Sequence, residues 1–255
     1  MAALDGLRIL DMTQYEAGTA CTQALAWLGA DVVKVEPPGT GDPGRGAFDA
    51  ETPDSQYFCV WNANKRSIVI DLRKPEGREL LLRMVPHYDV FVENYGPGVV
   101  EKLQLDYDTM KAIKPDLIYA RIKGFGTSGP WADYKCYDMV AQAAAGAFSI
   151  TGESEGPPMR PGPTTGDAGT GVQMALAIAA AYAQKLKTGT GQLIELSMQE
   201  AMTYCLRTAT SQSDWGEKAA ARTGNGVLPT MSLYPCKPGG PNDYLFVMAV
   251  TPPMW

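Results

Sequence analysis

Histidine is nearly absent from the sequence: His87 is the single one among 255 residues. It lies between a predicted helix and a predicted strand, where we expect a solvated loop position. A catalytic triad with a histidine base is therefore excluded unless His87 itself serves, and its position argues against that. The G-x-S-x-G and S-x-x-K motifs of serine hydrolases are absent as well, so the sequence gives no support to those classes.

Cysteine is also sparse: the five cysteines are scattered, and no two form a C-x-x-C pair. They favour neither a zinc site nor a disulfide framework, so we predict no metal and a reducing, cytoplasmic setting. The chain begins without the basic and apolar regions of a signal peptide. The longest apolar runs, at residues 141–150 and 172–183, are too short to span a bilayer, so no membrane partner is expected.

Basic charge is in deficit, with 22 Lys and Arg against 28 Asp and Glu and a net charge of −6. A nucleic-acid partner is therefore not expected, and an anionic ligand would need local basic clusters. The 45% hydrophobic and 20% charged content is that of an ordinary globular chain, long enough for one large domain plus part of another.

Alternating strand and helix patterns predict an α/β fold with a doubly wound, mostly parallel, Rossmann-like sheet. Strands are expected at 7–12, 32–36, 68–72, 89–94, 117–122 and 192–197, with helices at 17–28, 76–84, 99–103, 107–113, 138–146 and from Asp167 to 186. Loops dominate after residue 211, followed by one strand at 244–250. We therefore assign residues 1–210 to a large, ligand-binding α/β domain and residues 211–255 to a linker and the truncated start of a smaller domain.

A G-x-G-x-x-G pattern occurs at residues 39–44 but is not a dinucleotide-binding motif. Pro43 lies inside the pattern and no helix is expected after it, although that motif requires one. The segment is interpreted as an irregular surface loop.

Asp167 lies in an unusual stretch, PGPTTGDAGTG at 161–171, which runs directly into the helical residues 172–178. It fits two roles. A helix N-cap would accept a bond from a free backbone amide, whereas a nucleophilic carboxylate would have open backbone amides beside it. Three glycines around one acid are more than a cap requires. A carboxylate nucleophile without histidine indicates acyl or phosphoryl transfer through a mixed anhydride.

Polar and basic residues follow several of the predicted strands. Asn94 ends one strand and is followed by an aromatic residue and glycine, a usual place for ligand contact in a doubly wound sheet. Separated cations near the same edge (Arg73, Lys102 and Lys135) suit a phosphorylated ligand. The basic residues on either side of the strand at 68–72 fit solvated surface charge equally well.

The chain resembles the class III CoA-transferases, the family of formyl-CoA and carnitine CoA-transferases. The resemblance covers nearly the whole chain and rests on LDGLRILD at 4–11, AGTACTQ at 17–23, LGADVVKVE at 28–36, NKRSI at 64–68, ENYGPG at 93–98, KGFG at 123–126, GD at 166–167, KTGTGQ at 187–192 and SMQEA at 197–201. The formyl-CoA transferase branch is the most similar.

This resemblance implies that Asp167 is the catalytic nucleophile. It implies acyl-CoA, the thioester of coenzyme A, and a carboxylate acceptor as substrates, with no permanently bound cofactor. It also implies a homodimer of interlocked chains, and a large domain that later residues complete, so we expect this chain to be a fragment. The implied CoA-contacting residues are Tyr15, Glu16, Ala17, Ile70, Asp71, Leu72, Arg73, Asn94, Tyr95, Gly96, Lys102, Lys123, Lys135 and Tyr137.

Two positions depart from the formyl-CoA transferase pattern, Glu16 in place of glutamine and Pro37 in place of arginine, and its long glycine loop is not visible between 223 and 244. Glu16 either lies near the acyl group or points into solvent. Two other functions stay open. An α-methylacyl-CoA racemase would lack its basic histidine at Tyr137-Asp138, and a non-catalytic CoA-binding protein could share the fold.

Overall fold

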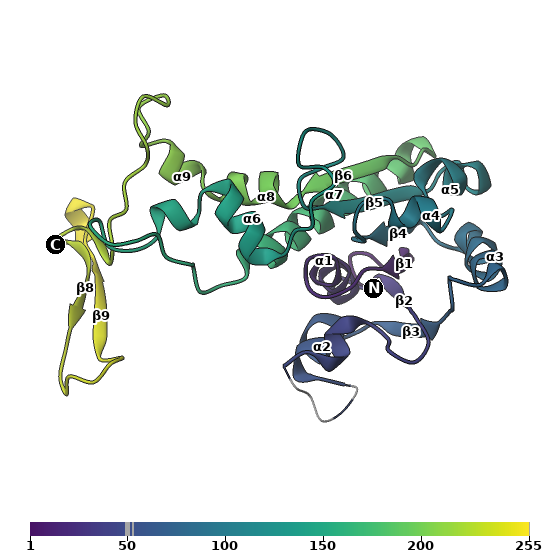
Figure 1. Ribbon diagram of the computed structural model, residues 1–255, viewed down its shortest axis with the longest axis horizontal. Coiled ribbons are helices and arrows are strands. Elements are labelled where there is room, and N and C mark those ends of the chain that lie inside the picture. The colour runs from purple at the N-terminus through teal and green to yellow at the C-terminus, as the bar shows by residue number, and fades with distance from the viewer. Residues whose placement is uncertain (49–51, 53, 255) are drawn as a thin grey trace.

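A computed structural model describes residues 1–48, 52 and 54–254 of the chain. Six parallel strands form the main sheet, in the order β3-β2-β1-β4-β5-β6 (Figure 1). They are β1 (Arg8–Met12), β2 (Asp31–Glu36), β3 (Arg66–Val69), β4 (Val90–Glu93), β5 (Ile118–Lys123) and β6 (Leu193–Ser197). The order reverses between β1 and β4, which makes the carboxyl ends of these two strands the expected ligand-binding crevice of a doubly wound fold.

Helices cover both faces of this sheet, which confirms the predicted fold class. One face carries α1 (Ala17–Trp27), α6 (Asp138–Ala145), α7 (Thr165–Thr188) and α8 (Met198–Cys205), and the other carries α3 (Pro75–Met84), α4 (Val99–Lys102) and α5 (Tyr107–Ile113). Successive residues of β1 point to opposite faces, so Ile9 joins the core under α1 and α7 while Leu10 joins the core under α3 and α5.

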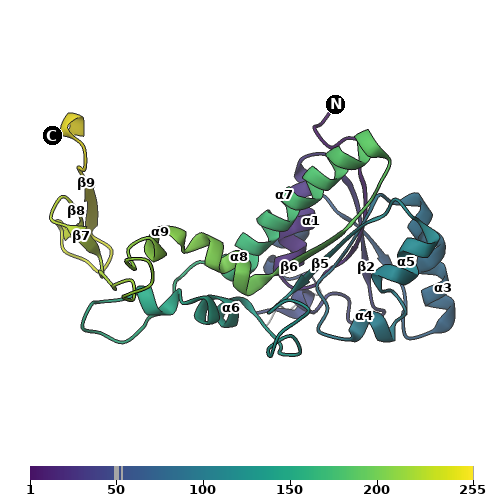
Figure 2. The same cartoon turned by 90° about the horizontal axis from the view of Figure 1, so that it is seen from above.

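Helices α1 and α7 pack closely, although about 150 residues separate them in the sequence (Figure 2). Gly171 lies at their contact, where an added Cβ would come within 2.6 Å of the carbonyl oxygen of Ala17. Glycine is therefore required for this approach. The contact matters for the site because α1 and α7 begin beside each other at the carboxyl edge of the sheet.

A second, antiparallel sheet contains β7 (Gly226–Leu228), β8 (Met231–Pro235) and β9 (Tyr244–Met248). It is set apart from the main sheet at the left of Figures 1 and 2. The sequence predicted β9 but not the other two strands, and it also missed α8 and the short helix α9 (Arg207–Thr210). The sheet falls within residues 211–255, but the proposed domain division stays a prediction.

Three local predictions around the first strands were wrong. The strand expected at 68–72 occupies 66–69. Residues 39–44 are not a surface loop throughout, because Asp42 and Gly44 are buried and the 3₁₀ helix η1 (Pro43–Gly46) begins there. Helix α2 (Gln56–Asn62) was missed although Ser55 caps it, accepting a bond from the Phe58 amide at 3.0 Å.

The remaining short elements are the 3₁₀ helices η2 (Val85–His87), η3 (Phe148–Ile150) and η4 (Pro252–Met254). His87 thus ends η2, between α3 and β4. Over the described part of the chain, we find no helix with the length and apolarity that crossing a membrane would demand.

Candidate active site

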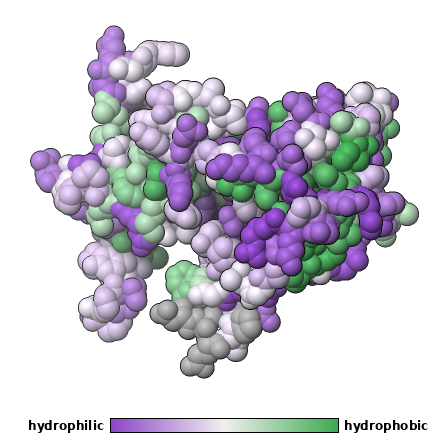
Figure 3. All heavy atoms as spheres, turned by 45° about the vertical axis from the view of Figure 1, so that its right-hand side comes forward, coloured by the Kyte–Doolittle hydropathy of each residue, from purple (hydrophilic) through white to green (hydrophobic). Residues whose placement is uncertain are grey.

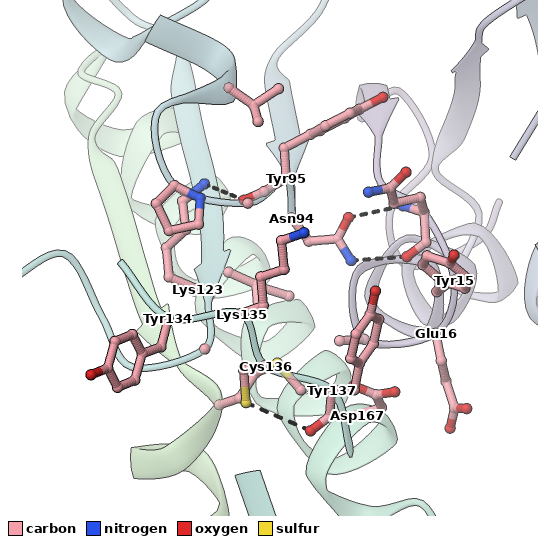
Figure 4. A pocket seen from close by; sticks show the side chains of 18 residues that line it. Tyr15, Glu16, Asn94, Tyr95, Lys123, Tyr134, Lys135, Cys136, Tyr137 and Asp167 are labelled. Atoms are coloured by element: carbon pink, nitrogen blue, oxygen red, sulfur yellow. Dashed lines mark hydrogen bonds between the residues drawn. The ribbon is translucent and has the colours of Figure 1, made fainter. Parts of the chain in front are cut away.

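A pocket of about 290 Å³ opens at the carboxyl edge of the main sheet, where the strand order reverses (Figure 4). Its wall combines the turns that follow β1, β4 and β5, the segment before α6 and the first turn of α7. It is lined by Gln14, Tyr15, Glu16, Ala17, Asn94, Tyr95, Gly96, Pro97, Val99, Ile122, Lys123, Gly124, Tyr134, Lys135, Cys136, Tyr137, Asp167 and Met198.

Asn94 joins the two turns at the centre of the pocket. Its amide oxygen accepts a bond from the backbone nitrogen of Gln14 at 2.9 Å, and its amide nitrogen donates to the Gln14 carbonyl, also at 2.9 Å. Figure 4 shows this two-bond contact between the turn after β4 and the turn before α1. Asn94 therefore satisfies the backbone of the neighbouring turn and fixes its position.

Tyr15 has an unusual backbone conformation, with a φ of 58° in the left-handed region. Residues other than glycine rarely adopt this backbone conformation, and those that do are often found near functional sites. The Tyr15 ring packs edge-on against that of Tyr137, with 5.9 Å between ring centroids. The two rings form one wall of the pocket, close to Asp167.

Asp167 is the third residue of α7 and not its N-cap, because the helix begins at Thr165. Its own backbone amide is capped by Asp138, whose carboxylate oxygen Oδ1 accepts the bond at 3.1 Å. Gly166 makes this possible, since an added Cβ would lie 2.6 Å from the Asp138 carbonyl oxygen. The Asp167 side chain is thus free of the capping role that the sequence left open.

Three carboxylates gather at this end of the pocket: Asp167, Glu16 and Asp138. Burial raises the pKa of Asp167 to about 7, and the negative charges of Glu16 and Asp138 add to the increase. Burial also raises the pKa of Glu16, which is 4% exposed. None of the described Lys or Arg residues lies within salt-bridge distance of Asp167.

Glu16 is buried and does not point into solvent, so that alternative was wrong, and its position near the acyl group stays a prediction. Its carboxylate accepts hydrogen bonds from the hydroxyl groups of Thr164 and Tyr57, the latter at 3.4 Å. These bonds hold Glu16 between α2 and the start of α7. The buried charge therefore becomes part of the electrostatic environment of Asp167.

The two lysines of the pocket differ in their contacts. Lys123 is buried, and its Nζ lies 2.8 Å from a Glu93 carboxylate oxygen and donates to the Tyr95 carbonyl at 2.8 Å. Its charge is largely neutralised there. Lys135 is exposed and has no ion pair among the described residues. Lys135 is thus the better placed of the two to bind an anionic ligand.

The structure brings together nine of the CoA-contacting residues implied by the resemblance, together with Asp167. The five that do not line this pocket are Ile70, Asp71, Leu72, Arg73 and Lys102. Ile70 is buried in the core under α3 and α5, and Arg73 is exposed and pairs with Asp71 at 2.9 Å. Lys102 is exposed at the end of α4. The roles of all these residues stay predictions.

Sequence reasoning did not predict that the side chains of Asp138, Tyr57 and Cys136 lie near Asp167. Asp138 was expected to begin a helix, as it does in α6, but nothing in the sequence showed that it also caps a second helix, α7. Burial, with the charges of Asp167 and Asp138, raises the pKa of the Cys136 thiol to about 12.

No grouping of His, Cys, Asp or Glu within the described ranges has the arrangement of a metal site.

Comparisons with known proteins agree with this geometry. The sequence profile of CoA-transferase family III matches residues 4–255. Two relatives named formyl-CoA:oxalate CoA-transferase, from Streptomyces avermitilis and Streptomyces coelicolor, are each 42% identical, and each alignment covers 99% of this chain and 65% of the relative. The chain thus spans about two thirds of the length of these relatives.

A crystal structure of a CAIB/BAIF family protein from Brucella suis superposes with a TM-score of 0.89. Its sequence is 34% identical, and the match covers 97% of this chain and 66% of that one. The profile, the relatives and the structure all identify the same family. The chain belongs to CoA-transferase family III.

Proposed function

We propose that the protein transfers CoA from a donor acyl-CoA to an acceptor carboxylate, with Asp167 as the nucleophile. The observation that carries the proposal is a carboxylate in the first turn of a helix, in a pocket, with no Lys or Arg of the described ranges paired to it. Such a carboxylate is available for attack, unlike one held in a salt bridge. Names of relatives support formyl and oxalyl groups as candidates for the transferred acyl groups.

The reaction begins when an Asp167 carboxylate oxygen attacks the thioester carbonyl carbon, and the C–S bond breaks to release CoA thiolate. The product is a mixed anhydride between Asp167 and the donor acyl group. The thiolate then attacks the Asp167 carbonyl carbon, which releases the donor carboxylate and leaves an aspartyl-CoA thioester. The acceptor carboxylate repeats the two steps in reverse, and Asp167 is regenerated.

Two features of the pocket favour this chemistry. The first turns of α1 and α7 both lie at the pocket, so the positive ends of two helix dipoles face the charge that develops on the attacked oxygen. Lys135 offers a cation for the CoA phosphates. We also infer that Tyr15 and Tyr137 pack against the pantetheine arm.

A homodimer and a cytoplasmic setting belong to the same proposal. Apolar side chains on α7 are exposed, with Val172 61% and Leu176 71% accessible, and so is Phe246 of β9 at 54%. Figure 3 shows hydrophobic side chains that reach the surface on one face of the molecule. A partner chain would cover such surface. The five free cysteines suit a reducing compartment.

The racemase alternative is not supported by the pocket. Its lining residues include no histidine, because His87 lies in η2 between α3 and β4. Tyr137 and Asp138 stand where the racemase base is expected, and the Asp138 carboxylate is already bonded to the Asp167 amide and to Gln142. The histidine of the histidine–aspartate pair that a racemase requires is therefore missing from the pocket.

Mass spectrometry of the protein mixed with acyl-CoA tests the proposal. A CoA adduct is expected on the peptide that contains Asp167, and it should be absent from Asp167→Ala. Because Cys136 lines the same pocket, a mixed disulfide with CoA would give a similar mass. Cys136→Ser and treatment with a phosphine, which cleaves disulfides but not thioesters, separate the two products. An adduct that stays in Asp167→Ala would reject Asp167 as the nucleophile.

The same experiment tests the non-catalytic alternative. A protein that only binds CoA would bind acyl-CoA without forming an adduct and without exchanging the acyl group. Transfer of CoA to a labelled carboxylate, measured for the wild type and Asp167→Asn, distinguishes catalysis from binding. Equal transfer in the two proteins would also reject the mechanism.

A further inference from the structure

Four side chains hold the backbone of the turn between β1 and α1, which carries Tyr15 and Glu16. The Asp11 carboxylate accepts from the Thr13 amide at 2.8 Å, and the Asn94 side chain forms hydrogen bonds with the backbone amide and the backbone carbonyl of Gln14. The other two anchors are Lys34 and Asp42, from β2 and the segment after it. Both are buried, and neither lines the pocket.

Asp42 is the anchor of Tyr15. One of its carboxylate oxygens, Oδ1, accepts from the Tyr15 amide at 3.1 Å and from the Gly44 amide at 2.8 Å. The other oxygen lies 2.7 Å from the Lys34 ammonium, and both side chains of this ion pair are 1% exposed. Lys34 also donates to the Thr13 carbonyl at 2.6 Å. The pair thus connects two points of the turn to β2.

This contact falls on a residue with an unfavourable backbone conformation. Tyr15 has a φ of 58°, and a residue with a Cβ keeps such a conformation only where its surroundings hold it there. The backbone that follows leads directly to Glu16, whose carboxylate accepts hydrogen bonds from Thr164, before α7, and from Tyr57 of α2. A change in Tyr15 would therefore move Glu16 relative to Asp167.

We propose that Asp42, supported by Lys34, is a positioning residue of the site: it holds Tyr15 in the left-handed conformation that places Glu16 beside Asp167. The proposal rests on the function proposed above, and it assigns a role to the segment at 39–44 that the sequence pattern left without one. Neither Asp42 nor Lys34 touches the pocket, so they act through Tyr15 and Glu16.

Two double variants isolate the contact that matters. Lys34→Met with Asp42→Asn removes the ion pair but keeps a side-chain oxygen that accepts from the Tyr15 amide. Lys34→Met with Asp42→Ala removes the ion pair and that oxygen. Neither leaves a buried charge without a partner, which would be strongly destabilising. The two proteins therefore differ in one side-chain oxygen, which accepts from the Tyr15 amide and from the Gly44 amide.

The readout is the titration of the Asp167 carboxyl group, followed by carbon NMR on labelled protein. Asp167 faces Glu16 from the turn before α1 and Asp138 from α6, and the Tyr57 and Cys136 side chains also lie in its electrostatic range. Release of Glu16 moves a negative charge away from Asp167. The Asp167 carboxyl group should therefore titrate about one pH unit lower in the double variant with Asp42→Ala (the Asp42→Ala pair) than in the wild type. The Asp42→Asn pair should stay close to the wild type.

Two controls separate positioning from a loss of stability. Asp106→Ala removes a cap from α5, where Asp106 accepts from the Thr109 amide at 3.0 Å far from the pocket, and it should leave the titration unchanged. If the Asp42→Ala pair does not fold, Lys34→Met with Asp42→Ser gives the same comparison, because serine places its oxygen one bond short of the Tyr15 amide.

An unchanged Asp167 titration in the Asp42→Ala pair would overturn the proposal. An equal shift in both pairs would overturn it too, since the effect would then belong to Lys34. The NMR measurement needs no substrate, so it reports on positioning even if the protein proves not to transfer CoA. If it does transfer CoA, the acid limb of kcat/KM should move with the titration, whereas a loss of folded protein would lower activity at every pH.

Discussion

Asp167 should make the folded protein less stable above neutral pH, and Asp167→Asn should restore that stability while abolishing transfer. Burial, Glu16 and Asp138 raise the pKa of the folded-state carboxyl from 3.8 to about 7. The unfolded chain ionises at the lower value. Between the two values the unfolded state alone releases its proton, so stability falls as pH rises. Asparagine carries no charge and escapes this effect.

The size of the effect follows from the two pKa values. A difference of roughly three pH units, at about 1.36 kcal/mol for each unit, corresponds to about 4 kcal/mol of unfolding free energy at pH 8. Near pH 4.5 the difference should be only about 1 kcal/mol, because that pH lies less than one unit above the unfolded-state pKa of 3.8. Asp167→Asn should therefore gain in stability over the wild type with rising pH, up to about pH 7.

Urea unfolding at several pH values between 4.5 and 8 measures this gain. Asp5→Asn serves as the matched control, because Asp5 is exposed at the start of the chain and its side chain forms no ion pair with the described residues. Its difference from the wild type should not change with pH. If Asp167→Asn shows a pH-independent difference, or loses stability at pH 8, then the Asp167 carboxyl is not held in an unfavourable environment and the reasoning about its reactivity fails.

Three further predictions concern the surroundings of Asp167. Glu16→Gln should move the acid limb of kcat/KM to lower pH, because it removes a negative charge near Asp167. It should also raise the use of dicarboxylate CoA esters relative to monocarboxylate esters. An unchanged substrate ratio would mean that the charge of Glu16 does not affect substrate selection. Lys135→Ala should weaken CoA binding by about 1 kcal/mol in a salt-dependent way, which calorimetry measures. Lys123→Ala should instead lower the unfolding free energy by about 3 kcal/mol, because it leaves the Glu93 carboxylate buried without its partner. Gly166→Ala should lower both Tm and kcat, because its Cβ would lie 2.6 Å from the Asp138 carbonyl oxygen. Gly169→Ala should be tolerated, because its Cβ would approach only the Cys205 sulfur, at 3.9 Å. Equal behaviour of the two variants would contradict the close approach at Gly166.

The sequence predicted the parallel sheet well, because its strands are short apolar runs between clear helix signals. The strand at 90–93 and the helix at 107–113 were found almost to the residue. The position of Asp167 at a loop-to-helix transition was also found. These features depend on local patterns, which a single sequence contains.

The electrostatic environment of the site could not be predicted in the same way. Lys65 was interpreted as possible surface charge, yet it is buried against Asp11 at 3.3 Å, and burial lowers its pKa to about 8. Asp138 was known only as the start of a helix, yet it caps another helix 29 residues away. Contacts of this kind arise when distant segments meet, and no periodicity in the sequence records them.

The glycines near Asp167 have a different explanation from the one that the sequence suggested. They were taken as open backbone for a ligand. In the structure, Gly166 accommodates Asp138 and Gly171 accommodates α1, whereas Gly169 alone has free space around it. Two of the three glycines are thus required by close packing between elements, a reason that the sequence did not suggest.

The close contact between α1 and α7 has a consequence for how the protein emerges during synthesis. Gly171 follows Ala17 by about 150 residues, and ribosomes add roughly 5–20 residues each second, so α1 waits on the order of 10–30 seconds for its partner helix. Until then the face of α1 that packs against α7 has no permanent cover, and Glu16 has no neighbour from α7. A nascent chain arrested before α7 should therefore attract chaperones more strongly than one arrested after β6.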